Sequence, residues 1–148
     1  MPTRRAFLRQ LDIPQVEAAI RQAEAGTSGE IRLSVAGFFR GDPRTLGERA
    51  FQRLRMHATR HRNGVLILVT PARRQVLVLG DEGIHARVGN AFWSGLVDSL
   101  RANLAEHKFT AGLVGAISAI GQELARHFPP DSEENPNELP DALDRAGP

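Results

Sequence analysis

The sequence predicts an α/β fold, an α/β/α sandwich in which a small mixed β-sheet is flanked by helices on both faces. Two apolar runs, residues 65–70 and 76–80, are joined by a short polar segment that opens with Pro71, a pattern typical of an antiparallel hairpin. An earlier strand pattern at residues 30–37 is separated from the hairpin by a helical pattern. A strand–helix–strand unit places its two strands parallel in one sheet. The sheet should therefore contain one parallel and one antiparallel pair.

Periodic apolar residues predict the helices. The first helix should begin after Asp12, an N-cap residue followed by Pro14, and end at Gly26. The other helical patterns cover residues 45–59, 83–88, 91–106 and 110–128, and Thr110 is the expected N-cap of the last one. A broad apolar stripe around Trp93 places this tryptophan in the core.

The three strand patterns differ in their expected burial. In residues 30–37, Ile31 and Leu33 alternate with Arg32 and Ser34, which predicts a half-buried strand. Neither run of the hairpin alternates, so both faces of the hairpin should be buried. The helices must therefore cover it.

Composition indicates one globular domain with an acidic tail. The 148 residues are 41% hydrophobic, enough for a single core over residues 1–129. Residues 130–148 hold six acids and one base, net −5, so residues 1–129 carry +7 against a total of +2. The tail is expected to be disordered. No apolar run of about 18 residues and no signal peptide is seen, so a soluble cytoplasmic protein is expected.

Strand ends predict the candidate site. Two parallel strands that begin on one edge and an antiparallel strand that ends there bring together Glu30, Asn63, Asp81 and Glu82. Carboxylate and amide oxygens suit Ca²⁺ or Mg²⁺, and the absence of cysteine excludes thiolate zinc sites and thiol nucleophiles. Two alternatives remain open. The four residues could serve only as caps and turns, or Arg62 could pair with Asp81 and take the place of the cation.

Other chemistry is less well supported. His57 and His61 are spaced to share a helix face, which makes half a zinc site without further ligands. Ser28 and Ser94 have no evident base, and no phosphate-binding glycine loop is present. With seven phenylalanines, one tryptophan and no tyrosine, the chain shows no clear nucleic-acid signature. Four arginines could form an anion-binding surface for an acidic partner or a membrane: Arg49, Arg53, Arg73 and Arg74.

Several segments together resemble the TPM domain, named for thylakoid, photosystem and modulator proteins, and most of all its short soluble bacterial branch. They are TSGEIR from Thr27, RNGVL from Arg62, GDEGIH from Gly80, Phe92 with Trp93, and LARHFP from Leu124. The resemblance covers almost all of residues 7–129.

The resemblance implies an α/β/α sandwich, Ca²⁺ or Mg²⁺ in strand-end loops, a phosphatase activity, and links to photosystem repair and membrane-protein complexes. Two residues depart from the family pattern. Arg62 stands where many relatives carry the Asp of a DNG triplet, and Asn90 stands where an Asp often follows. Three functions remain open: a binding or accessory module with little or no catalysis, a metal-dependent phosphatase, and an arginine-rich scaffold.

Overall fold

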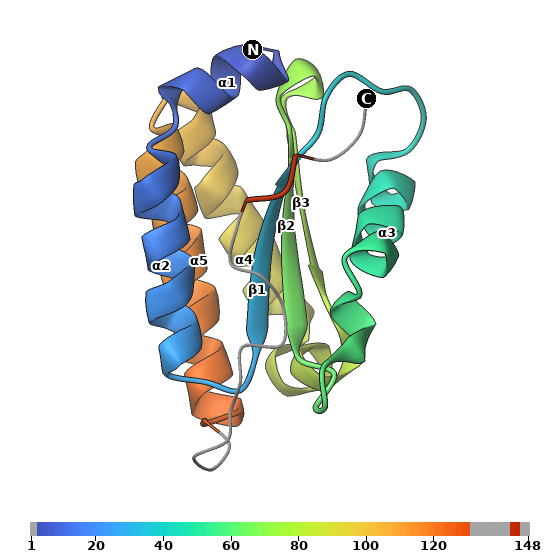
Figure 1. The fold of residues 1–148 in the computed structure, drawn as a ribbon, viewed down its shortest axis with the longest axis vertical. Helices are drawn as coiled ribbons and strands as arrows, with labels where there is room; N and C mark the ends of the chain where they lie inside the picture. The colour runs from blue at the N-terminus through green and yellow to red at the C-terminus, as the bar shows by residue number, and fades with distance from the viewer. Residues whose placement is uncertain (1–2, 131–142, 146–148) are drawn as a thin grey trace.

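The computed structural model describes residues 3–130 and 143–145. Within them, a three-stranded sheet lies between four helices on one face and one α-helix on the other (Figure 1). The predicted α/β sandwich with helices on both faces of a mixed sheet is confirmed.

The sheet has the order β1-β2-β3, with β1 at Glu30–Val35, β2 at Gly64–Thr70 and β3 at Gln75–Gly80. β1 and β2 are parallel, with Glu30 opposite Gly64, whereas β2 and β3 are antiparallel. Both pairings were predicted. They follow from the connections, because a helix joins the parallel strands and a short 3₁₀ turn joins the hairpin.

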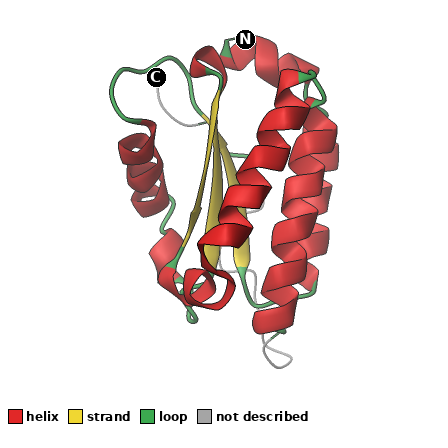
Figure 2. Ribbon diagram, turned by 180° about the vertical axis from the view of Figure 1, so that it is seen from behind, coloured by secondary structure: helices red, strands yellow, loops and turns green. Residues whose placement is uncertain are grey.

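Four helices cover one face of the sheet (Figure 2). They are α1 (Arg4–Gln10), α2 (Ile13–Ala25), α4 (Glu82–Ala105) and α5 (Phe109–His127). The predicted bounds of α2 are confirmed, whereas α1 was not predicted. Only one of its seven residues, Phe7, is buried, so the amphipathic pattern of this helix is weak.

The main core lies between this helical layer and the sheet. Its strand members point to the same face in alternation, and its largest fully buried side chains come from α1, α2, α4, α5 and the strands. Those side chains are Phe7, Ile20, Ile31, Leu33, Ile67, Ile84, Leu100, Leu113 and Ile117.

The opposite face is covered by α3 (Pro43–Arg53) and the 3₁₀ helix η1 (Met56–Ala58). A smaller cluster around Phe51 and Leu66 fills this layer. The prediction of one helix over residues 45–59 is wrong at its end. The helix stops at Arg53 because Arg55 takes a left-handed conformation, with φ of 58°.

The burial of two strands also differs from expectation. β1 is buried on both faces, including Arg32 and Ser34, rather than half-buried. β3 is an edge strand that is only half-buried, although the hairpin was expected to be covered on both faces. α3 and α4 cover the faces of β3, but β3 is an edge strand of the sheet that residues 3–130 form, so one of its sides is not paired with another of these strands.

Three local predictions are resolved on α4 and α5. The expected interruption between residues 88 and 91 is confirmed as a kink at Gly89, with φ of 77° and ψ of 175°. Thr110 does not cap α5, since its hydroxyl accepts a hydrogen bond from the Asp12 amide instead. Trp93 packs against the core, as predicted, but it is only half-buried.

The predicted disordered tail lies outside the described residues except at positions 143–145. These three residues lie beside β1, where Asp144 forms an isolated parallel bridge with Ser34 (Figure 1). In the described part of the chain, no helix combines the length and the apolar character that crossing a membrane requires.

Candidate functional site

The expected meeting of three strand ends is present at one edge of the sheet. Glu30 lies opposite Gly64, and the Asp81 amide donates to the Gly64 carbonyl at 2.9 Å. β2 lies between β1 and β3, so Glu30 and Asp81 are separated by two strand spacings, roughly 10 Å. The edge is shared, but the four predicted ligands do not converge on one point.

Asp81 is the centre of this corner. Its side chain is 4% exposed, and it is the N-cap of α4. The carboxylate accepts from Arg62 Nε at 2.8 Å, Arg62 Nη2 at 3.1 Å and the Glu82 amide at 2.8 Å. The structure therefore contains the internal Arg62–Asp81 pair that the sequence left open.

The protonation of Asp81 follows from these contacts. Burial by itself raises the pKa of Asp81, but the hydrogen bonds from Arg62 and from the Glu82 amide, with the positive field of His57 and Arg62, outweigh it. The pKa of Asp81 is therefore lowered. A carboxylate held ionised by a guanidinium and an amide is a poor general base, because its lone pairs already accept hydrogen bonds.

His57 lies beside the pair. Its Nδ1 is 3.2 Å from Asp81 Oδ2 and 3.0 Å from Arg62 Nη2. The tautomer of His57 decides whether Nδ1 donates to Asp81 or accepts from Arg62. Its ring also packs on Phe51 at 4.5 Å between centroids. The expected sharing of one helix face with His61 is wrong, because α3 ends before both residues.

The other predicted ligands have separate surroundings. Asn63 is fully buried and donates to Ser28 Oγ at 3.2 Å, which ties β2 to the loop before β1. Glu30 is 3% exposed at the start of β1. The Glu82 side chain is 74% exposed and reaches Arg62 Nη1 at 3.4 Å. Asn90 is exposed next to the kink of α4.

These residues do not fit a tightly held divalent ion. A guanidinium already occupies both oxygens of Asp81, the most central predicted ligand. Among residues 3–130 and 143–145, no three His, Cys, Asp or Glu side chains are grouped as a metal site requires. The donor set would need Arg62 to move before a cation could approach Asp81.

Close packing explains the glycines of the RNG and GDEG segments. A Cβ on Gly83 would lie 2.1 Å from the His61 carbonyl oxygen, and one on Gly80 would lie 2.5 Å from the Trp93 ring. A Cβ on Gly64 would lie 2.9 Å from the Met56 carbonyl oxygen. The two segments therefore interlock through their backbones, and Arg62, with φ of 52°, makes the turn that allows it.

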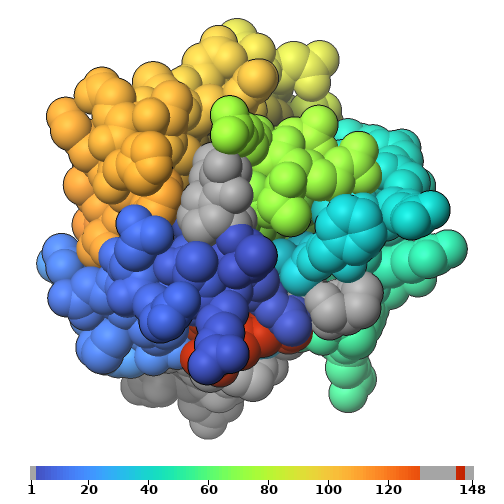
Figure 3. Space-filling model, turned by 90° about the horizontal axis from the view of Figure 1, so that it is seen from above, coloured from blue at the N-terminus to red at the C-terminus, as the bar shows by residue number. Residues whose placement is uncertain are grey.

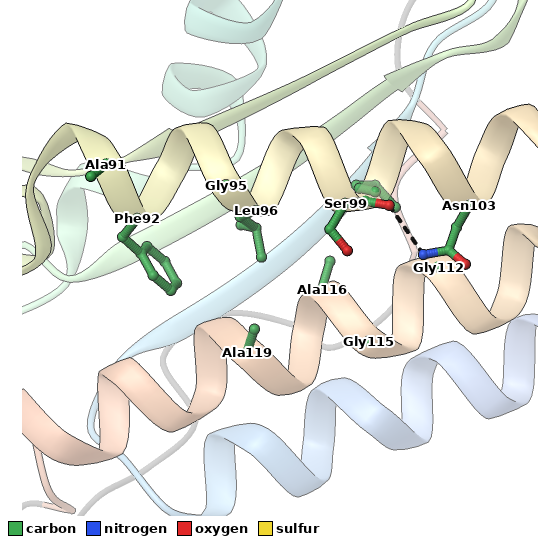
Figure 4. Close-up of a pocket in the computed structure, with 11 residues that line it drawn as sticks. Ala91, Phe92, Gly95, Leu96, Ser99, Asn103, Gly112, Gly115, Ala116 and Ala119 are labelled. Carbon is green, nitrogen blue, oxygen red and sulfur yellow. Dashed lines mark hydrogen bonds between the residues drawn. The ribbon is translucent and has the colours of Figure 1, made fainter.

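One hollow lies beside this corner, and another lies between two helices. A cavity of about 400 Å³ between α3 and the end of β3 is lined by Glu48, His57 and Asp81, among others. A second, of about 470 Å³, runs between α4 and α5 and is lined by small and apolar side chains (Figure 4). None of the eleven residues drawn in it is ionisable, so this groove has no evident chemistry.

Sequence reasoning missed a second cluster, at the other end of β1. The Asp144 carboxylate accepts from Ser34 Oγ at 2.9 Å and from both terminal nitrogens of Arg53. Burial raises the pKa of Asp144, but these hydrogen bonds, with the charges of Arg53 and Arg32, outweigh it and lower the pKa. Arg53 and Asp144 are 91 positions apart, so no local pattern could have paired them.

Comparison with known proteins gives a consistent result. The family model of the TPM domain matches residues 4–123. The NMR structure of the BA42 protein from the psychrophilic bacterium Bizionia argentinensis is 31% identical, with a TM-score of 0.83 over 92% of this chain and 95% of that chain.

A more distant structure shows the fold alone. The N-terminal domain of the cg2496 protein from Corynebacterium glutamicum is 20% identical, with a TM-score of 0.59 over 76% of this chain and 71% of that chain. No protein of curated function matches the sequence.

Proposed function

Because the chain belongs to the TPM domain family, we propose that it is a binding or accessory module with little or no catalytic activity, which serves the maintenance of a membrane-protein complex or another protein assembly. The family resemblance motivates the assembly role. The geometry of the strand-end corner motivates the absence of strong catalysis.

The Arg62–Asp81 pair is the observation that carries this proposal. A metal-dependent phosphatase needs carboxylates that are free to hold a cation, which then polarises the phosphate or activates water. Here the central carboxylate is buried against a cation supplied by the chain itself. Arginine cannot lose its proton near neutral pH, so it does not act as an acid or base in place of the metal.

Any divalent ion should bind weakly and beside Asp81, with Glu82, which also contacts Arg62, as the further carboxylate. Glu30 lies two strand spacings away and Asn63 is bonded to Ser28, so neither is placed to complete the site. Ca²⁺ or Mg²⁺ is the expected ion, because the donors are carboxylate oxygens. Its binding would have to displace Arg62 from Asp81, and this competition lowers the affinity.

Thermal unfolding with added CaCl₂ or MgCl₂, beside a p-nitrophenyl phosphate assay, tests the proposal. The wild-type chain should show neither a metal-dependent rise in Tm nor turnover, whereas Arg62→Ala should have a lower Tm. Asp98→Asn, an exposed acid on α4, is the matched control for Asp81→Asn. A calcium-induced stabilisation that Asp81→Asn abolishes and Asp98→Asn keeps would establish a metal site at this corner. Metal-dependent hydrolysis with the same dependence on Asp81 would establish the phosphatase alternative instead.

A further inference from the structure

The outer edge of β1 is occupied by a short piece of the chain from far along the sequence. The Val35 amide donates to the Asp144 carbonyl, and the Asp144 amide donates to the Leu33 carbonyl, both at 3.0 Å. These are the hydrogen bonds of an added parallel strand, made by one residue. Exposed sheet edges accept extended segments in this way.

An apolar anchor precedes the backbone pairing. Leu143 is 7% exposed and belongs to the main core, on the face covered by α2. Its amide donates to Glu17 Oε2 of α2 at 2.8 Å. The edge therefore offers a pocket for one apolar side chain beside a carboxylate acceptor for its amide.

The next side chain lies on the opposite face, as in any extended segment. Asp144 meets Arg53 of α3 through two parallel hydrogen bonds, Nη1 to Oδ1 at 3.1 Å and Nη2 to Oδ2 at 2.9 Å. The hydroxyl of Ser34, which is fully buried, donates to Oδ2 at 2.9 Å. This geometry selects a carboxylate, because the guanidinium fork and the hydroxyl all donate.

The hydrogen-bond partners named above all belong to residues 17–53, and they bind an apolar residue followed by an acid. In the view from above, the segment reaches the surface beside the start of α1 (Figure 3). An approaching peptide would therefore meet the edge from solvent.

We infer that this edge of β1 is a recognition site for an extended peptide of a partner protein that carries an apolar residue followed by Asp or Glu, and that Leu143 and Asp144 are its intramolecular occupant. The inference rests on the proposed function, since it names the class of partner that the binding module takes. The bound peptide pairs with Leu33 and Val35, places its apolar side chain in the core-facing pocket and its carboxylate on Arg53.

A partner peptide is favoured over a second copy of this chain. A tethered occupant acts at an effective concentration in the millimolar range. The same segment from another copy has no better contacts, so it loses this competition at lower protein concentrations. A partner segment with a larger apolar anchor or flanking strand residues can win it, which makes the site switchable by the partner.

The test uses the full-length chain and a fluorescein-labelled peptide of residues 140–146, Pro-Asp-Ala-Leu-Asp-Arg-Ala. Asp144→Arg places a positive charge against Arg53 and should release the intramolecular occupant. Fluorescence anisotropy should show the peptide binding to this variant at least about tenfold tighter than to wild type, which is still occupied. In NMR spectra, the amides of Ser34 and Val35 should shift, and those of α5 should not.

Charge reversal gives the matched controls. Arg53→Glu combined with Asp144→Arg restores an intramolecular ion pair with the two charges exchanged. This double variant should not bind the peptide. Arg49→Glu combined with Asp144→Arg changes an exposed arginine of the same helix, and this double variant should still bind the peptide. A probe peptide with Asn in place of its second Asp should bind weakly.

Several outcomes would overturn the inference. One is a folded Asp144→Arg variant that does not bind the peptide, and another is equal binding of the Asn probe. If Asp144→Arg fails to fold, Asp144→Ala is tested with the same probe, and failure of both variants to fold would show the segment to be structural only. A wild-type dimer whose chains exchange residues 143–145, seen by intermolecular cross-linking, would assign the site to a second copy. None of these outcomes involves metal or phosphatase activity, so they are distinct from a failure of the proposed function.

Discussion

The guanidinium of Arg62 makes two hydrogen bonds to the carboxylate of Asp81, at 2.8 and 3.1 Å, where β2 begins and β3 ends. The pair joins a turn in the left-handed conformation to the N-cap of α4. The pair therefore connects the start of β2 to the start of α4, and its removal should destabilise both elements.

Arg62→Ala should lower the stability of the fold, because it leaves the buried Asp81 carboxylate without its main cationic partner. The midpoint of urea unfolding, followed by Trp93 fluorescence, measures this. Arg62→Lys should recover only part of the loss, since an ammonium cannot reproduce the two parallel contacts. Arg49→Ala, on the exposed face of α3, serves as the control, and a loss as large as that of Arg62→Ala would contradict a specific role for the pair.

Asp81→Ala should cost about 1 kcal/mol through loss of the N-cap alone, and more through Arg62. Asp81→Asn keeps a side-chain acceptor for the Glu82 amide and so separates the cap from the charge. Urea unfolding of the two variants at pH 7 measures the difference. Equal stability of Asp81→Ala and wild type would show that α4 does not depend on this cap.

The pH dependence of stability has a definite sign at Asp81. Burial raises its pKa, but the Arg62 hydrogen bond and the other contacts outweigh burial, so the folded-state pKa lies below the ordinary 3.8. The ionised form therefore stabilises the fold fully above pH 3.8, and this contribution is lost as the pH falls through the lower folded-state pKa.

Urea midpoints measured from pH 7 down to pH 2.5 test that sign. The difference between wild type and Asp81→Asn should be constant above about pH 5 and should shrink below pH 3.8. The Asp81→Asn variant should still lose stability in acid, because the pKa of Asp144 is lowered as well. A difference that grows as the pH falls would contradict the assignment.

Gly83→Ala should be strongly destabilising, by about 3 kcal/mol or more, because the new Cβ would lie 2.1 Å from a backbone oxygen that cannot move aside easily. Gly115→Ala is the control. It lies in α5 with no atom within 4 Å of its Cβ position, so it should stabilise the protein by about 0.4–1 kcal/mol. Thermal unfolding of both variants provides the comparison, and a Gly83→Ala protein with the wild-type Tm would show that the two segments do not interlock.

Trp93→Ala should cost about 2–3 kcal/mol, less than the 3–5 kcal/mol expected for a fully buried tryptophan. The ring covers Gly80 and donates through Nε1 to His85 Nδ1 at 3.0 Å, but it is only half-buried. Urea unfolding followed by circular dichroism measures the loss. A cost at or above the full-burial range would mean that the ring carries more of the core than its exposure indicates.

Local patterns were sufficient for most of the elements and for the pairing of the strands, although they missed α1 and the end of α3. Asp12 and Gly26 mark α2 because capping depends on a few adjacent residues. The hairpin and the parallel pair follow from connection lengths, which are also written locally in the sequence. The common strand edge of Glu30, Asn63 and Asp81 then follows from topology alone, and so does the possibility that Arg62 reaches Asp81.

Tertiary structure decided what covers each face and which charges meet. Arg32 and Ser34 alternate with apolar residues as solvent-facing side chains do, yet both are buried, and Ser34 donates to Asp144, which comes from the far end of the sequence. Arg62 is the partner of Asp81, while Glu30 lies two strands away. Alternation along a strand tells which side chains share a face, but burial and ion pairing depend on groups brought there from distant parts of the chain, such as Asp144 onto Arg53. Such contacts depend on three-dimensional distance, which a one-dimensional pattern does not encode.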